Sequence, residues 1–170
     1  FAMDIQDLGA VFAKSEFKAF REALDAGGVI RAINGKGMAA ASSRKQLDAW
    51  TETARLFGAK GLVWLKVEAD GSISGSAAKF ISEDEKHALL GAMDATAGDL
   101  LLIVADQWRC ACEVMGRLRL DLAAKAGIID DKVLNFLWVV EFPLLDWDAE
   151  SGRFVAVHHP FTAPPVIPST

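Results

Sequence analysis

The feature that most constrains the fold is an uninterrupted apolar run near the middle of the chain. Residues 99–105 read DLLLIVA, so six apolar side chains follow one another without a polar residue between them. A strand with one face in water alternates apolar and polar side chains, whereas an unbroken run is typical of a buried strand. We therefore expect residues 99–105 to form the central strand of a sheet.

Two strong helix signals lie on either side of this strand. Ser43 and Gln46 have the spacing of a capping box, in which each side chain bonds a free backbone amide of the first turn. The helix that they open should end at Gly58, which can adopt the left-handed stop, and it carries an apolar stripe at helical spacing: Leu47, Trp50, Ala54 and Phe57. Residues 107–126 carry a longer stripe and predict the longest helix of the chain.

Strand signals surround these helices. Residues 29–33 follow a Gly-Gly turn and predict a strand, as do residues 61–68, which are rich in Val, Trp and Leu. The dipeptide Asp70-Gly71 is a strong hairpin signal. It predicts that residues 61–68 pair with a second strand between residues 73 and 80.

The remaining elements complete a mixed pattern. Ser82 and Glu85 form a second capping box, opening a helix that we expect to end at Gly98. Residues 136–142 and 153–158 predict two more strands, and a short opening helix is expected from the spacing of Ile5, Leu8 and Phe12. The alternation favours an α+β fold, a two-layer sandwich whose antiparallel sheet carries helices on one face.

Composition excludes several classes of protein. The net charge is −5, whereas a main nucleic-acid surface usually carries a basic excess for phosphate contacts. No apolar run reaches the roughly 18 residues that a membrane span needs. We expect no signal peptide, because charged residues interrupt the opening segment. Cys110 and Cys112 would lie about 200° apart on a helix, so we expect reduced thiols and a cytoplasmic location.

Few residues have the spacing of a chemical site. The sequence has no phosphate-cradling glycine loop, no nucleophile elbow and no His or Cys cluster at metal-ligand spacing, so no catalytic residue and no metal ligand is predicted. The local feature that stands out is His158-His159-Pro160, at the end of an expected strand. Adjacent strand side chains point to opposite faces, so one of the two histidines can meet a given ligand. A ligand contact and a structural role stay equally open on the residues alone.

Several segments resemble bacterial-type aspartyl-tRNA synthetases, in one continuous order. They include SRKQLDAWTETARLFGAKGLVWLKVE, GDLLLIVAD, MGRLRLDLAAKAGIID and FLWVVEFPLLDWDAESGRFVAVHHPFTAP. The resemblance implies that residues 15–134 are the GAD domain that this family inserts into its catalytic core, with two strands, a helix, two strands and a helix. It further implies that residues 1–14 leave the core and that residues 135–170 return to it.

The resemblance also implies a function. The family is an aspartate–tRNA ligase, which activates L-aspartate with ATP to aspartyl-adenylate and transfers it to tRNA in protein biosynthesis. ATP and Mg²⁺ would bind to a full-length, homodimeric enzyme; these 170 residues alone should be inactive and bind neither. The first histidine of HHPFT faces the bound aspartate in the family, which carries over to His158. Two alternatives stay open: a tRNA- or partner-binding module of a tRNA-dependent amidotransferase subunit, and a structural spacer.

Overall fold

The structure, a computed structural model, describes residues 3–130, 132–134, 136–140, 143–148 and 150–157. It consists of two compact units, residues 1–133 and residues 134–170, which are considered separately. The elements are, in chain order, β1 (Gln6–Asp7), α1 (Lys18–Asp25), β2 (Val29–Gly35), α2 (Arg44–Leu56), β3 (Val63–Val67), β4 (Ile73–Gly75), a 3₁₀ turn η1 (Ala78–Phe80), α3 (Glu83–Ala92), β5 (Leu100–Asp106), α4 (Trp108–Lys125), β6 (Leu145–Asp148) and β7 (Arg153–Ala156). Among the described residues, no helix is both long and apolar enough to cross a membrane.

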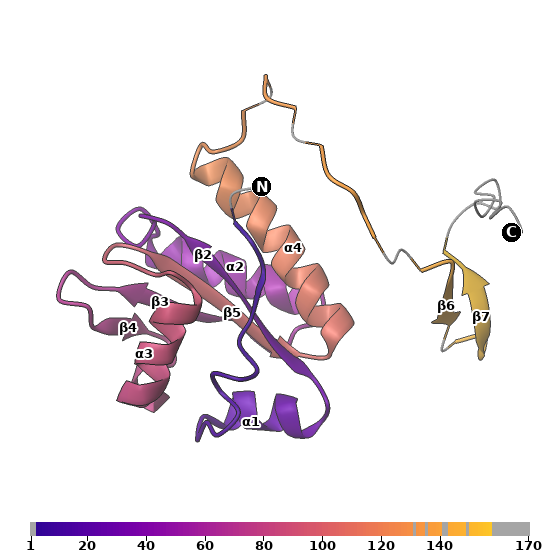
Figure 1. Ribbon diagram of the computed structural model, residues 1–170, viewed down its shortest axis with the longest axis horizontal. Helices are drawn as coiled ribbons and strands as arrows, with labels where there is room; N and C mark the ends of the chain where they lie inside the picture. Colours follow the sequence, from indigo (N-terminus) through magenta and orange to yellow (C-terminus); the bar gives the residue numbers. More distant parts are fainter. Residues whose placement is uncertain (1–2, 131, 135, 141–142, 149, 158–170) are drawn as a thin grey trace, which may run out of the picture. The chain divides into compact units, whose positions relative to one another are not determined.

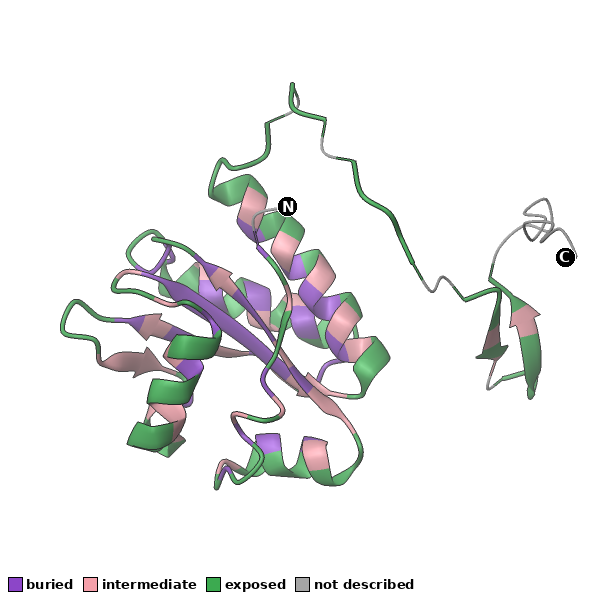
Figure 2. Cartoon of the chain, viewed as in Figure 1, coloured by how far each residue is buried: buried purple, intermediate pink, exposed green. Residues whose placement is uncertain are grey.

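The first unit is built on an open, antiparallel, five-stranded sheet. Its strand order is β1-β2-β5-β3-β4 (Figure 1). The apolar run forms β5 at the centre, paired with β2 from Leu100 to Asp106 and with β3 from Leu100 to Ile103. Residues 100–104 are fully buried, and Figure 2 shows this strand as the most continuously buried element. The predictions of an antiparallel sheet, an α+β class and a central strand here are therefore confirmed.

Helices cover both faces of the sheet, and this corrects the expected placement of helices on one face. Leu100, Leu102 and Val104 point into a core formed with α2 and α4. Leu101 and Ile103 point the opposite way, into a second core formed with α1, α3 and the N-terminal segment. The unbroken apolar run has a physical reason, because both sides of β5 are buried and neither needs polar residues.

The N-terminal segment is not the helix that its apolar spacing predicted. Gln6 and Asp7 form the edge strand β1, paired with Ala32 and Arg31 of β2. The Leu8 amide continues this pairing by donating to the Ile30 carbonyl at 2.9 Å. The spacing of three and four residues between Ile5, Leu8 and Phe12 fits a helix. In the structure Leu8 and Phe12 are instead buried against the sheet, and this packing goes with an extended backbone at β1.

The helix caps follow the sequence closely at α2 and α3. Ser43 Oγ accepts from the Gln46 amide at 3.3 Å, which is the first half of the predicted box. At α3 both halves form, since Ser82 Oγ accepts from the Glu85 amide and Glu85 accepts from the Ser82 amide at 2.9 Å. The predicted end of α3 at Gly98 was wrong: the helix ends at Ala92, before the left-handed residue 94.

The β3–β4 hairpin turns at the predicted Asp-Gly pair, with Gly71 at φ 79°. Its second strand is shorter than expected because it stops at Gly75, where φ is 144° and a Cβ would collide with the Trp64 carbonyl oxygen. We expect Gly75→Ala to lower the free energy of unfolding by about 2–3 kcal/mol in urea titrations. Gly71→Ala is the matched control: its φ is also positive but its Cβ would meet open space, so about 1 kcal/mol is expected. Equal losses would show that the hairpin relieves the collision.

The second unit contains one described hairpin. Strands β6 and β7 pair antiparallel, with Trp147 opposite Phe154 and Leu145 opposite Ala156. The Asp148 carboxylate accepts from the amides of residues 150 and 151 and closes the turn. The strand predicted at 153–158 is confirmed as far as Ala156. Residues 136–140 form no helix or strand, contrary to the predicted strand at 136–142, whose last two residues lie outside the described ones.

Candidate functional site

The histidine that the sequence singled out lies outside the described residues. His158 and His159 both fall there, and with them the substrate contact expected for His158. The chain before them is described: the Val157 amide donates to the Leu144 carbonyl at 3.0 Å, extending the β6–β7 pairing. Phe154 packs edge-on against Trp147, with the ring centroids 5.2 Å apart. Phe154 therefore lies on the same side of the hairpin as Trp147. Residue 156 lies on that side too, because alternate residues of a strand share a face.

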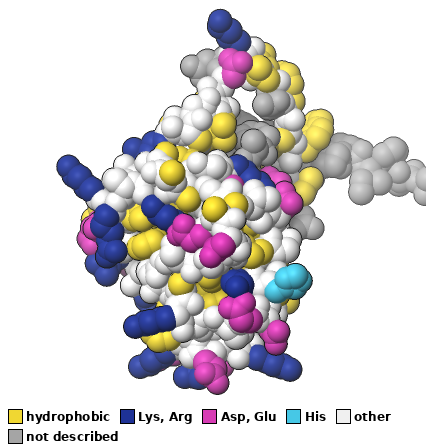
Figure 3. All heavy atoms as spheres, turned by 90° about the vertical axis from the view of Figure 1, so that its left-hand side faces the viewer, with side chains coloured by type: hydrophobic (Ala, Val, Ile, Leu, Met, Phe, Trp, Pro, Cys, Tyr) yellow, Lys and Arg dark blue, Asp and Glu magenta, His cyan; other side chains and the backbone are white. Residues whose placement is uncertain are grey.

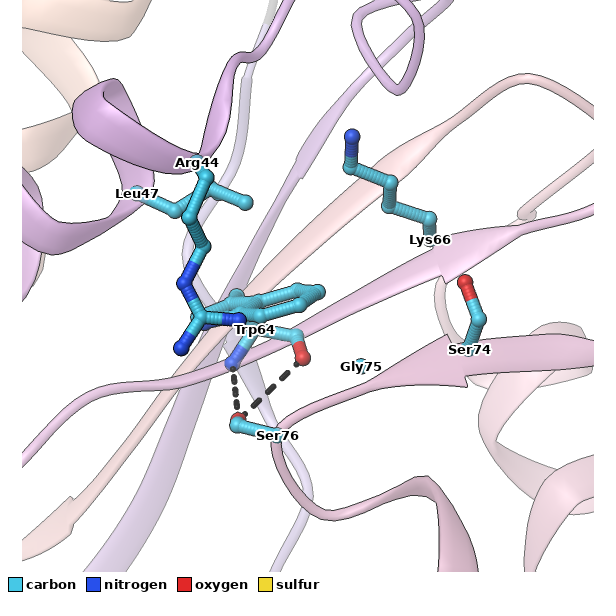
Figure 4. A pocket seen from close by; sticks show the side chains of 7 residues that line it. All are labelled: Arg44, Leu47, Trp64, Lys66, Ser74, Gly75 and Ser76. Atoms are coloured by element: carbon cyan, nitrogen blue, oxygen red, sulfur yellow. Dashed lines mark hydrogen bonds between the residues drawn. The ribbon is translucent and has the colours of Figure 1, made fainter.

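A pocket of about 420 Å³ in the first unit is lined by charged, aromatic and hydroxyl-bearing side chains. The start of α2 supplies Arg44 and Leu47, and the β3–β4 hairpin supplies Trp64, Lys66 and a Ser-Gly-Ser segment, residues 74–76. Figure 4 shows the Arg44 side chain descending from α2 beside the Trp64 indole, with Lys66 projecting from the same strand as Trp64. The pocket therefore joins two cations, an aromatic ring and two hydroxyls.

Strand alternation explains why the hairpin residues share one side. Trp64 and Lys66 are two residues apart on β3, and Lys66 lies opposite Ser74 on β4. Trp64 packs against the core beneath α2 and α4, whereas Ile73, which precedes Ser74, packs against the other core. The polar face of the hairpin thus lies on the α2 side of the sheet.

The two pocket cations are held by polar partners. The Arg44 guanidinium carbon lies 5.6 Å from the centroid of the indole, in cation–π range. Arg44 Nε is also 3.2 Å from Asp48 Oδ1, one turn along α2. Lys66 Nζ donates to the Ser42 carbonyl at 2.8 Å. Both cations are thereby directed along the rim of the pocket, with N–H groups to spare for an anion.

A buried carboxylate fixes the loop that leads to this pocket. Asp99 is 2% exposed and accepts from the Gly37 amide at 2.8 Å, the Thr96 amide at 3.0 Å and the Asn34 side chain at 3.1 Å. Lys36 Nζ lies 3.6 Å away. Burial would raise the pKa of Asp99, but these donors and the lysine charge outweigh it, so the pKa lies below the usual value. Asp99 is thus a charged anchor between the loop after β2 and the start of β5.

Among the residues that the structure describes, the remaining reactive groups do not form a second site. Burial, followed by the charges of Asp106 and Glu113, raises the pKa of the Cys110 thiol, which makes it a weak nucleophile. His87 is exposed on α3. No cluster of three His, Cys, Asp or Glu side chains able to hold a metal occurs within the described ranges. Acidic and basic side chains both occur on the face seen in Figure 3.

The sheet, its two layers of helices and the polar pocket at the hairpin define a small α+β domain. The family model that matches this chain, over residues 20–115, is that of the GAD domain, and the chain belongs to this family.

Named relatives are similar over nearly the whole chain. This chain is 50% identical to an aspartate–tRNA ligase of Bacillus licheniformis over 164 residues. Over the same length it is 47% identical to aspartate–tRNA(Asp/Asn) ligases of Bacillus cereus and Bacillus thuringiensis. Each alignment covers 96% of this chain and 28% of the relative. The chain therefore spans little more than a quarter of the length of these relatives, and the predicted resemblance to bacterial aspartyl-tRNA synthetases is confirmed.

The sequence did not single out the pocket. Half of the pocket could have been found from the sequence, because Trp64 and Lys66 lie two residues apart in an expected strand and so share a face. Its other half comes from the beginning of α2, about twenty residues earlier, and no local pattern brings Arg44 over that strand.

Proposed function

We propose that this chain is a segment of an aspartate–tRNA ligase, in which residues 15–134 are the inserted GAD domain. Residues 1–14 would leave the catalytic core before the insert, and residues 135–170 would return to it. The observation that carries the proposal is the identity of 47–50% over 96% of the chain to proteins of that name. The GAD-family match over residues 20–115, inside the proposed insert, supports it.

The full-length enzyme would join L-aspartate to ATP, giving aspartyl-adenylate, and then pass the aspartyl group to tRNA. ATP with Mg²⁺, L-aspartate and tRNA are its expected ligands, and we propose a cytoplasmic homodimer. This chemistry depends on positioning the carboxylate and phosphate and on offsetting charge. His158 is proposed to contribute a contact to the aspartate from the returning segment.

The segment alone is expected to fold without catalysing. The first unit contains both of its cores, so residues 1–133 should unfold cooperatively in urea or on heating. ATP–pyrophosphate exchange with L-aspartate should stay at background for the 170-residue chain. It should be rapid for a full-length protein that carries this segment.

Two results would contradict the proposal. Exchange by the isolated chain would show that it holds a complete active site. A full-length protein without aspartate-dependent exchange, but with binding to an amidotransferase, would favour a partner-binding module instead. A thermal melt by circular dichroism serves as the control that the chain tested for exchange is folded.

A further inference from the structure

The strand β2 ends on an Asn-Gly dipeptide, and both of its residues are held by contacts with distant parts of the chain. Asn34 Nδ2 donates to Asp99 Oδ2 and to the Met93 carbonyl, at 3.1 Å each. Gly35 is buried, and a Cβ there would lie 2.9 Å from Leu122 Cδ2. This end of the strand therefore needs a short donor followed by a residue without a side chain, and asparagine before glycine meets both needs.

We propose that Asn34 is a site of spontaneous modification, at which opening of this end of β2 leads to loss of the side-chain amide as ammonia. The Gly35 nitrogen attacks Cγ of Asn34, the bond from Cγ to Nδ2 breaks, and ammonia leaves with the proton of the Gly35 amide. Water then opens the five-membered succinimide at either carbonyl, which leaves aspartate or isoaspartate at position 34. Water is the only co-reactant, and glycine is the residue that hinders the attack least.

The folded strand prevents this attack. The Ile30 carbonyl accepts from the Leu8 amide on the β1 side at 2.9 Å, and backbone groups alternate sides along a strand. The Gly35 amide therefore points the other way, toward β5, where Gly35 lies opposite Leu100. The nitrogen must leave this pairing before it can turn to the Asn34 side chain. The rate of modification therefore follows the population in which this end of β2 is open.

The product cannot restore the contacts of the asparagine. An ionised carboxylate accepts hydrogen bonds and donates none, yet the groups that face Nδ2 are the Asp99 carboxylate and the Met93 carbonyl. The other position is no better, since Asn34 Oδ1 is already buried without a partner among the described residues. The nearby cation, Lys36, is 3.6 Å from Asp99 and already paired with exposed Asp94.

Two like charges against each other at a half-buried position disfavour the folded chain. Isoaspartate adds a further fault, because it lengthens the backbone by one carbon and displaces the register of β2. The modification therefore makes a transient opening permanent, since the strand end cannot return to its anchor at Asp99. This conclusion is independent of the proposed function, because it uses contacts within the first unit alone.

The test follows Asn34 in the 170-residue chain by peptide mass spectrometry during incubation at mildly alkaline pH. The change from amide to acid alters the mass, and isoaspartate, detected with an isoaspartyl methyltransferase, identifies the succinimide route. The folded chain should convert Asn34 at least about a hundredfold more slowly than the urea-unfolded chain. The other asparagine, Asn135, precedes phenylalanine and is the internal reference, because a bulky neighbour hinders the same attack.

Matched variants separate local opening from global unfolding. Asp99→Asn weakens the anchor and should raise the rate at Asn34 at least about tenfold. Phe20→Leu acts at the other end of β2, since Phe20 lines a hollow with Ala105, which pairs with Ile30. At urea concentrations that give both variants the same free energy of unfolding, Asp99→Asn should still convert faster. Asn34→Asp, which installs one product directly, should raise the unfolded fraction at least about tenfold at pH 7.

Any of four outcomes would overturn the inference. They are equal rates in the folded and the unfolded chain, conversion without isoaspartate, an Asn34→Asp variant as stable as the unmodified chain, and equal rates in the two destabilised variants at matched free energy of unfolding. The last would place the step in the globally unfolded chain. Circular dichroism verifies that each variant is folded at the start. The assay involves neither a ligand nor catalysis, so it can fail while the proposed ligase activity holds, and the reverse.

Discussion

Asp99→Ala is expected to lower the free energy of unfolding by about 4 kcal/mol. The carboxylate is buried and accepts from two backbone amides and the Asn34 side chain. Alanine would leave these donors without an acceptor at the junction of two loops. Small domains are stable by about 5–15 kcal/mol in total, so the variant should unfold at a much lower urea concentration.

The same carboxylate predicts how stability depends on pH. Because the pKa of Asp99 is lower in the folded chain, the unfolded chain binds its proton more tightly. The stabilisation is therefore complete above about pH 4, near the unfolded pKa, and is lost as the pH falls through the folded pKa. The difference in unfolding free energy between the unmodified chain and Asp99→Asn should be largest at pH 7 and should shrink below pH 4.

Asp94→Asn provides the matched control for this carboxylate. Asp94 also pairs with Lys36, at 3.0 Å, but its side chain is 94% exposed. An exposed pair contributes little, so the change in unfolding free energy should stay within about 0.5 kcal/mol at every pH. If Asp94→Asn and Asp99→Asn behaved alike, the Lys36 charge rather than the buried hydrogen bonds would be the source of the stability.

Elements specified by local chemistry could be predicted from the sequence. The serine caps of α2 and α3, the Asp-Gly turn and the apolar run of β5 each depend on residues close together in the chain. The family could also be predicted, because long segments of the chain resemble bacterial aspartyl-tRNA synthetases in one continuous order. The end of α3 was misplaced since a left-handed aspartate, residue 94, ends the helix before the glycine that looked like its stop.

Features specified by distant contacts could not be predicted. The apolar spacing of Leu8 and Phe12 fits a helix, and only pairing with β2 shows that this segment adds an edge strand and covers a second face. In the sequence Asp99 only precedes an apolar run. Nothing near it indicates that the loop after β2 places hydrogen-bond donors against its carboxylate. The pocket needs α2 above the β3–β4 hairpin, a relation between segments that no periodicity encodes.

His158→Ala, in the full-length enzyme, is expected to raise KM for L-aspartate about tenfold to a hundredfold. His158 is proposed to face the amino-acid substrate, and a lost charged hydrogen bond is worth about 1.5–3 kcal/mol. The pairing of β7 with β6 is described as far as Val157, and adjacent strand residues point to opposite faces. His158 and His159 are therefore expected on different sides.

His159→Ala is the matched control, because it removes the same ring one residue away. Its KM for L-aspartate should change by less than about threefold, since opposite strand faces cannot meet one small ligand. The KM for ATP should change little in either variant, because the predicted contact of His158 is to the amino acid. Steady-state ATP–pyrophosphate exchange, with aspartate and ATP varied separately, measures all four values. Equal losses in the two variants, or a loss confined to ATP, would reject His158 as the aspartate contact and would point to a structural role for the pair.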